Sequence, residues 1–178
     1  PPAGAAMKAR ITAGLLTLVG VLAIPSMTLA APGDLDPTFG SGGKVVTDFG
    51  GAGGAASAVA LQPDGKIVVV GTTGETFDEQ VIALARYNPD GSLDTTFSGD
   101  GKTSTDVAGG FGAAARSVAI QPDGKIVVCG WSNGGWDGEQ LVVGGGEIVR
   151  YTPAGELDTT LGVGGIAMLQ AMYALAIE

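Results

Sequence analysis

Apolar residues along this chain fall in short runs separated by polar turns. The segment 62–71 (QPDGKIVVVG) returns with one change at 121–130 (QPDGKIVVCG), 59 positions further on. In both copies the apolar run follows a Pro-Asp-Gly turn, in which proline fixes φ, aspartate bonds nearby backbone and glycine accepts a positive φ. The pattern predicts a hairpin, with strands over 57–62 and 66–72 of the first copy.

A second block has the same construction. Residues 86–97 (RYNPDGSLDTTF) return at 150–161 (RYTPAGELDTTL), 64 positions later. This block predicts a second hairpin, with strands over 81–88 and 92–97. The predicted structural turn residues of the two hairpin types are Pro63, Asp64, Gly65, Pro89, Asp90, Gly91, Pro122, Asp123 and Gly124.

Three further segments complete the unit. Residues 44–49 and the matching 102–107 are expected to add an edge strand or to extend the last strand. The extra positions of the second copy fall around 133–138, whose glycines predict a lengthened loop. A third copy of the closing segment opens at 34–40 (DLDPTFG).

The predicted fold is therefore all-β, built from antiparallel β-sheet repeats. Four or five strands per unit make a sheet the size of one propeller blade. The chain then forms an incomplete β-propeller-like array of about two blades plus a partial one, and known propellers close with about four to eight. We expect a piece of a longer array, an open stack of sheets, or a protomer that completes itself by association. Residues 166–177 are expected to form an edge strand or a helix.

The first residues predict a secretory signal peptide with a helical core. Met7 to Arg10 supply positive charge, residues 11–24 are apolar and uncharged, and Thr28-Leu29-Ala30 has the small-x-small form of a cleavage site. The apolar run has 14 residues, fewer than the roughly 20 that span a bilayer. We therefore expect a secreted, periplasmic or cell-surface protein.

The domain organisation follows from these segments. We divide the chain into an upstream extension (1–6), the signal peptide (7–30), repeat 1 (31–97), repeat 2 (98–161) and a truncated repeat 3 (162–178).

The composition limits which partners and which catalytic or metal-binding chemistries are possible. Eighteen acidic residues stand against nine basic ones, and a field of that sign repels nucleic acid and anionic lipid. The chain has no histidine, which excludes serine–histidine, cysteine–histidine and histidine–zinc chemistry. The lone Cys129 occupies the strand position of Val70 in the other copy, so we interpret it as a small buried hydrophobic side chain.

Two groups of residues are candidate sites. The carboxylates of Asp90, Asp94, Asp100 and Asp106 lie close along the sequence and could bind calcium, although a repeated turn aspartate more often bonds backbone amides. No cofactor is otherwise predicted.

The second group lies where the two copies differ. Trp131 and Trp136, expected together in the lengthened loop beside Asp137 and Glu139, could stack on a sugar ring or cover a sheet edge. Paired carboxylates such as Asp137 and Glu139 could serve a glycosidase-like reaction, but alternation in a glycine-rich loop is weak support for one.

The blocks around 35–40, 62–71 and 85–94 resemble the delta-60 repeat family of exported bacterial proteins. The resemblance covers nearly all of 34–165 and implies a β-propeller-like array outside the cytoplasm, with no established activity. The function predicted is an exported, non-enzymatic β-repeat scaffold that presents loops for binding or joins an envelope or surface assembly. The alternatives are a fragment of a propeller-type hydrolase or lyase and a calcium-stabilised adhesion module. The expected partners are protein or carbohydrate at the cell surface, or further copies of the repeat in cis or in trans, and not nucleic acid.

Overall fold

A computed structural model describes residues 31–50, 53–107, 109, 111–136, 141–142 and 144–169. The predicted extension and signal peptide lie outside these residues, as does the end of the chain from 170 onwards. Ten strands and no helix occur in the described residues, so none of them forms a helix able to cross a membrane. The prediction of an all-β chain of antiparallel repeats is confirmed.

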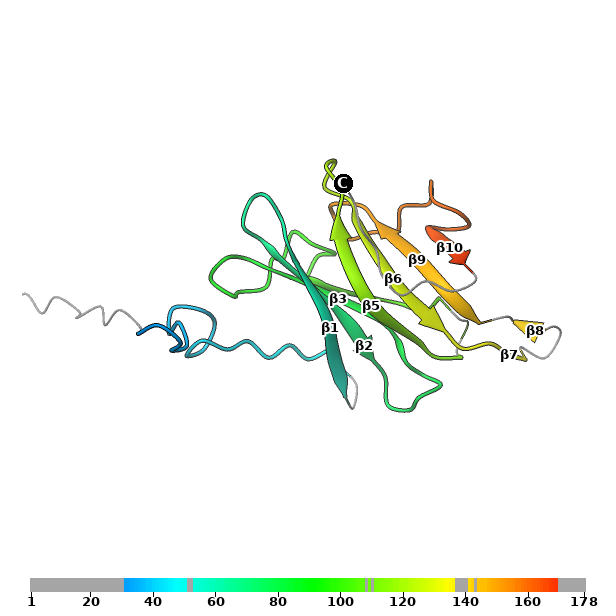
Figure 1. The fold of residues 1–178 in the computed structure, drawn as a ribbon, viewed down its shortest axis with the longest axis horizontal. Helices are drawn as coiled ribbons and strands as arrows, with labels where there is room; N and C mark the ends of the chain where they lie inside the picture. Colours follow the sequence, from blue (N-terminus) through cyan, green and yellow to red (C-terminus); the bar gives the residue numbers. More distant parts are fainter. Residues whose placement is uncertain are drawn as a thin grey trace, which may run out of the picture.

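The strands form two four-stranded sheets (Figure 1). The first runs in sequence order, and each neighbouring pair is antiparallel. The second has the same up-and-down order, except that a small hairpin interrupts it between its second and third strands. The strands of the first sheet are β1 (Gly54–Leu61), β2 (Ile67–Thr73), β3 (Val81–Tyr87) and β4 (Lys102–Thr105). Those of the second are β5 (Ala113–Ile120), β6 (Ile126–Ser132), β9 (Gly145–Tyr151) and β10 (Ile166–Leu169), and the hairpin is β7 (Gly135–Trp136) with β8 (Leu141–Val142).

The two sheets correspond strand by strand. β5 and β6 lie 59 positions after β1 and β2, whereas β9 and β10 lie 64 positions after β3 and β4. The change in offset falls at the β7–β8 hairpin, where the sequence predicted the lengthened loop. The added residues therefore extend one connection and leave the pairing of the four strands unchanged.

The repeated turns close the hairpins through the residues that the sequence singled out. Gly65 N donates to the carbonyl of Gln62, and Gln62 N donates to the carbonyl of Lys66. Asp64 Oδ1 accepts a hydrogen bond from Lys66 N at 3.2 Å. Gly65 has a φ of +84°, which glycine adopts without a steric penalty. The turns at Asp123 and Asp90 repeat this arrangement.

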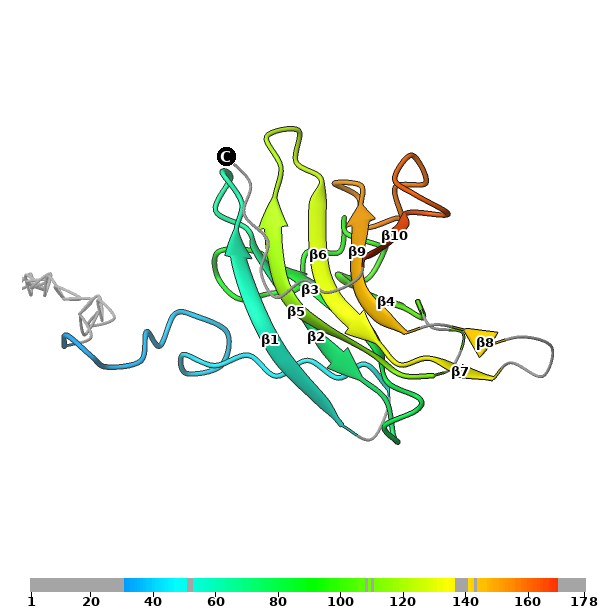
Figure 2. The same cartoon turned by 45° about the vertical axis from the view of Figure 1, so that its right-hand side comes forward.

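The predicted strand over 92–97 is wrong. Asp94 Oδ1 instead accepts bonds from both the backbone N–H and the hydroxyl of Thr96, and these bonds fold the segment into a turn. The turn at Asp90 and an isolated bridge from Tyr87 to Leu93 are formed, but residues 92–97 do not continue as a strand. On the side away from β2, β3 pairs with β4, so residues 102–105 supply the fourth strand of the first sheet. The matching segment 44–49 is not a strand, and it runs as coil outside the first sheet (Figure 2).

The end of the chain was expected to be an edge strand or a helix. Ile166–Leu169 is an edge strand, paired with β9. The rest of that predicted segment lies outside the described residues.

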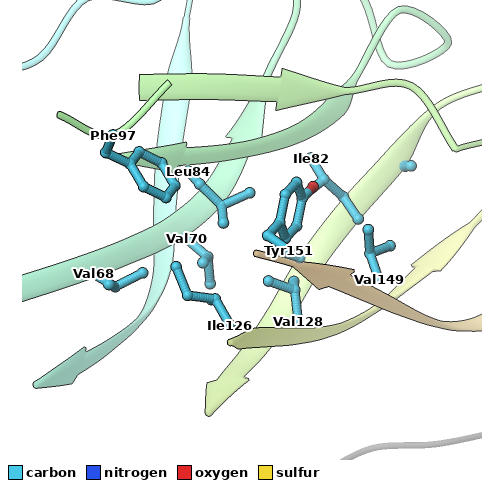
Figure 3. Packing of buried hydrophobic residues seen from close by; sticks show 11 residues of the cluster. Val68, Val70, Ile82, Leu84, Phe97, Ile126, Val128, Val149 and Tyr151 are labelled. Atoms are coloured by element: carbon cyan, nitrogen blue, oxygen red, sulfur yellow. The ribbon is translucent and has the colours of Figure 1, made fainter. Parts of the chain in front are cut away.

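The main core lies between the two sheets. One face of the first sheet packs against one face of the second, as the close view of the buried side chains shows (Figure 3). The first sheet contributes Val68, Val70, Ile82 and Leu84, and the second contributes Ala113, Ala115, Ile126, Val128, Val149 and Tyr151.

Candidate functional site

A buried ionic cluster recurs in both repeats. In the first, Asp94 Oδ2 accepts from Arg86 Nε at 2.8 Å and lies 3.1 Å from Lys66 Nζ. Arg86 also donates to Thr96 Oγ1 at 3.2 Å. The cluster joins β3, the start of β2 and the turn that precedes β4, and it therefore fixes the turn against the sheet.

The second repeat contains the same cluster. Asp158 Oδ2 lies 2.7 Å from Arg150 Nε and 3.2 Å from Lys125 Nζ, and Arg150 donates to Thr160. All the charged side chains that repeat at these positions are thus paired within the chain. They act in holding turns rather than as free acids or bases.

These contacts shift the pKa of both aspartates. Burial would raise the pKa of Asp94, but hydrogen bonds from Thr96 and Lys66 and the charge of Arg86 together hold it well below its usual value. At Asp158 the bond from Thr160 is the largest influence, and its pKa is likewise lowered. Both carboxyls are therefore ionised at neutral pH and unsuited to act as proton donors.

The first cluster also forms part of the contact between repeats. Arg86 Nη1 donates to the carbonyl of Pro153 at 2.6 Å, and its guanidinium lies 4.8 Å from the centre of the Phe97 ring. Phe97 is fully buried and lies directly against Gly155. Arg86 is 6% exposed and its counterpart Arg150 is 19% exposed, so the following repeat completes the burial of the cluster in the repeat before it.

The four aspartates proposed for calcium have different surroundings. Asp90 accepts from Ser92, Asp100 from Lys102 N, and Asp94 belongs to the ionic cluster. Asp106 is exposed and lies close enough to Glu147 to influence its pKa. Among the described residues no three acidic or cysteine side chains gather into a group that could hold a metal ion. Calcium binding therefore remains a prediction for which these four residues give no common geometry.

The two tryptophans do not share one loop, and that expectation was wrong for Trp131. Trp131 belongs to β6, because the apolar run of the hairpin continues through Gly130 to Ser132. Trp136 lies in β7, and the structure describes only its backbone. Asp137 and Glu139 lie outside the described residues.

Trp131 instead belongs to a patch formed by both repeats. Its ring centre lies 5.9 Å from that of Phe77, with an interplanar angle of 36°, and the guanidinium of Arg116 lies 6.0 Å from it. Phe77 is 58% exposed, in the β2–β3 loop of the first repeat. We call Trp131, Phe77 and Arg116 the aromatic patch. Neither Phe77 nor Arg116 was predicted from the sequence, although a single aromatic residue within the polar loop 74–80 was a usable signal.

Glu147 is a buried carboxyl with few partners. It takes the place of Ala83 in the first sheet, and it is fully buried. Ser132 donates its hydroxyl to Oε1, while Oε2 has no hydrogen-bond partner among the described residues. Burial raises the pKa of Glu147, the Ser132 bond partly offsets this, and nearby Asp106 adds to the rise. Glu147 was not predicted from the sequence either, since its burial depends on the stacking of the sheets.

Cys129 is 1% exposed, and burial raises the pKa of its thiol. The interpretation of this residue as a small buried hydrophobic side chain is confirmed. A thiol that is buried and un-ionised is a poor nucleophile.

The family model described as "Domain of unknown function (DUF5122) beta-propeller" matches residues 62–97 and 121–161. These two segments contain the Pro-Asp-Gly turns and the two ionic clusters described above. The chain carries β-propeller-like repeats. The sheets built by these repeats have the blade-like, four-stranded antiparallel form that such a family implies. No curated protein and no solved structure matches the chain.

Proposed function

We propose that this protein is an exported, non-enzymatic β-repeat scaffold that presents surface features for binding. The observation that carries the proposal is the pairing of the repeated charged residues inside the two ionic clusters. The recurrent Lys, Arg and Asp side chains hold the turns against the sheets and so make the repeats rigid. Binding is then the role of the parts that differ between repeats.

The aromatic patch is the binding feature that we favour. Trp131 occupies the position of Thr72 in the first repeat, so the patch belongs to one junction and is not a constant part of the unit. The exposed ring of Phe77 and the half-buried ring of Trp131, beside a guanidinium, suit the apolar face and the hydroxyls of a sugar ring. We therefore favour a carbohydrate of the cell surface as the ligand.

Calorimetric titration of the full chain with chito- and cello-oligosaccharides tests this role. We expect binding that weakens about tenfold or more in Phe77→Ala, since loss of one aromatic platform costs about 1–2 kcal/mol. Val163→Ala is the matched control, because Val163 is 88% exposed and lies outside the patch. Unchanged affinity in Phe77→Ala, or no binding to any of these sugars, would contradict the role of the patch.

A separate assay addresses the alternative of a hydrolase or lyase. The full chain would be screened with glycoside, lactone and ester substrates, and the scaffold proposal expects no turnover. Reproducible turnover that is abolished by changing one carboxylate would overturn it.

Export is part of the same proposal. Mass spectrometry of the secreted product is expected to give a mature start near Ala31. Retention of residues 7–30 in a membrane fraction would contradict cleavage of the signal peptide.

A further inference from the structure

The two sheets stack head to tail, so their equivalent faces have different surroundings. Cross-strand pairing places Val59 beside Val69 and Leu61 beside Ile67, on the side of the first sheet that faces away from the second. We call this side the open face. Val59 is 63% exposed and Leu61 is 70% exposed.

The same positions are covered in the second repeat. The counterparts of Ile67 and Val69 are Ile126 and Val128, which are both 0% exposed. The counterparts of Val59 and Leu61 are Val118 and Ile120, which pack against the core. The first sheet covers them with the aliphatic side chains of Val68, Val70, Ile82 and Leu84.

The segment that precedes the first sheet makes contacts of the kind that one repeat makes to the next. Gly40 N donates to Asp90 O at 2.7 Å, as Ser98 N donates to Ala154 O at 2.8 Å. The hydroxyls of Thr47 and Tyr87 are 2.6 Å apart. This pair matches the bond of 2.7 Å between Thr105 and Tyr151.

One difference separates the two situations. Thr105 belongs to β4, which is paired with β3 in its own sheet. Thr47 occupies the equivalent place on Tyr87, but no strand pairs with residues 44–47 in the part of the chain that the structure describes. Val46, within this segment, is 96% exposed. Residues 44–47 thus occupy the position that β4 has relative to the next repeat, but the three strands that would complete their own sheet are not among the described residues.

A hollow of about 650 Å³ lies between this segment and the open face, and Val45, Ile67, Val69 and Tyr87 are among the residues that line it. Its lining is mostly apolar, as are the side chains that fill the equivalent space in the second repeat. The occupant indicated by both the unpaired strand and the aliphatic face is a sheet of this same repeat.

We propose that the open face is the docking surface for the three leading strands of a further repeat of this kind, which takes residues 44–47 as its fourth strand. The occupant presents aliphatic side chains at the positions of Val68, Val70, Ile82 and Leu84. Backbone pairing to residues 44–47 sets its register, and burial of Ile67 and Val69, flanked by Val59 and Leu61, supplies the apolar contact. This inference does not depend on the binding role of the aromatic patch.

A repeat copied from the chain itself serves as the probe for this docking surface. A copy of residues 50–91 inserted directly before Asp34 continues into residues 34–47, which align with 92–105, and so builds a complete extra repeat in cis. Hydrogen exchange at residues 44–47 is expected to slow about tenfold or more on insertion. Val59→Asp/Leu61→Asp should abolish this protection in the extended chain while leaving the melting temperature of the original chain little changed, because both side chains are exposed there.

Two results would overturn the proposal. One is hydrogen exchange at residues 44–47 that the inserted repeat leaves unaltered. Equally, protection of these residues that persists in the Val59→Asp/Leu61→Asp variant of the extended chain would overturn it. The other is dimerisation of the original chain in sedimentation that the same double substitution abolishes, without protection of residues 44–47. That result would assign the open face to a second whole copy of the chain.

Discussion

The phenolic hydroxyl of Tyr151, on β9 of the second sheet, donates a hydrogen bond of 2.7 Å to Thr105 Oγ1 on β4 of the first. Tyr151 is 1% exposed, and burial raises the pKa of its hydroxyl well above the usual range. The bond therefore joins the two repeats through a neutral, water-excluded pair. Thr47 and Tyr87 form the same pair at the other end of the first repeat.

Tyr151→Phe should lower the free energy of unfolding by about 1 kcal/mol, because a buried hydrogen bond is lost while the ring still fills its space. Urea denaturation measures the change. Tyr87→Phe is the matched control and should cost less, since Thr47 is only half-buried and water can replace the bond there. A larger loss in Tyr87→Phe than in Tyr151→Phe would show that this pair does not hold the repeats together.

Glu147→Gln should change how stability depends on pH. The folded-state pKa of Glu147 lies above its ordinary value of 4.5, so the folded protein holds this proton more tightly than the unfolded chain. Stability from this group is then complete below about pH 4.5 and is lost as pH rises toward the folded-state pKa. Glutamine does not titrate, so the variant should melt at a higher temperature relative to wild type as pH rises from 4 to 7.

Calorimetric melting across that range measures the effect, and Glu156→Gln serves as control because Glu156 is exposed. Parallel profiles for wild type and Glu147→Gln would show that burial does not perturb this carboxyl.

Asp94→Asn should destabilise the protein more than Asp158→Asn. Removal of the Asp94 charge leaves Arg86, whose side chain is 6% exposed, without its carboxylate partner, and we expect a loss of about 2 kcal/mol or more. Arg150 is more exposed and water can solvate it in the second variant. Chemical denaturation at neutral pH ranks the two, and equal losses would contradict the role of the following repeat in burying Arg86.

The same aspartates predict acid sensitivity of the wild type. Their folded-state pKa values lie below the ordinary value of 3.8. Their contribution is therefore complete above about pH 4 and falls away as pH drops toward the folded-state values. A melting temperature that stays constant from pH 4 to pH 2 would exclude this contribution.

Gly155→Ala tests the closeness of the repeat contact. An added Cβ would lie 2.8 Å from the Phe97 ring, and Gly155 has a φ of +94°. Steric overlap and backbone strain together should cost about 3 kcal/mol. Gly164→Ala carries the strain alone, because Gly164 has a φ of +63° and nothing within 4 Å of its Cβ position, and should cost about 1 kcal/mol. Denaturation curves that show the same loss in both would mean that Phe97 moves aside freely.

The sequence by itself determined the hairpins, because each depends on a local turn. The Pro-Asp-Gly residues at 63–65 and 122–124 force a reversal whatever lies beyond them, and the alternating apolar runs on either side fix which side chains share a face. Duplication of the blocks was enough to predict two equivalent sheets and a buried Cys129.

The tertiary structure decided what depends on the partner of each segment. Residues 92–97 have strand-like composition, yet Asp94 is drawn into an ionic cluster with Arg86 and Lys66, and the fourth strand comes from 102–105 instead. The burial of Glu147, the meeting of Trp131 with Phe77 and the exposure of Val59 follow from how the sheets stack. Equivalent residues in the two repeats have the same local sequence but different neighbours, and contacts between distant segments are not encoded in local spacing.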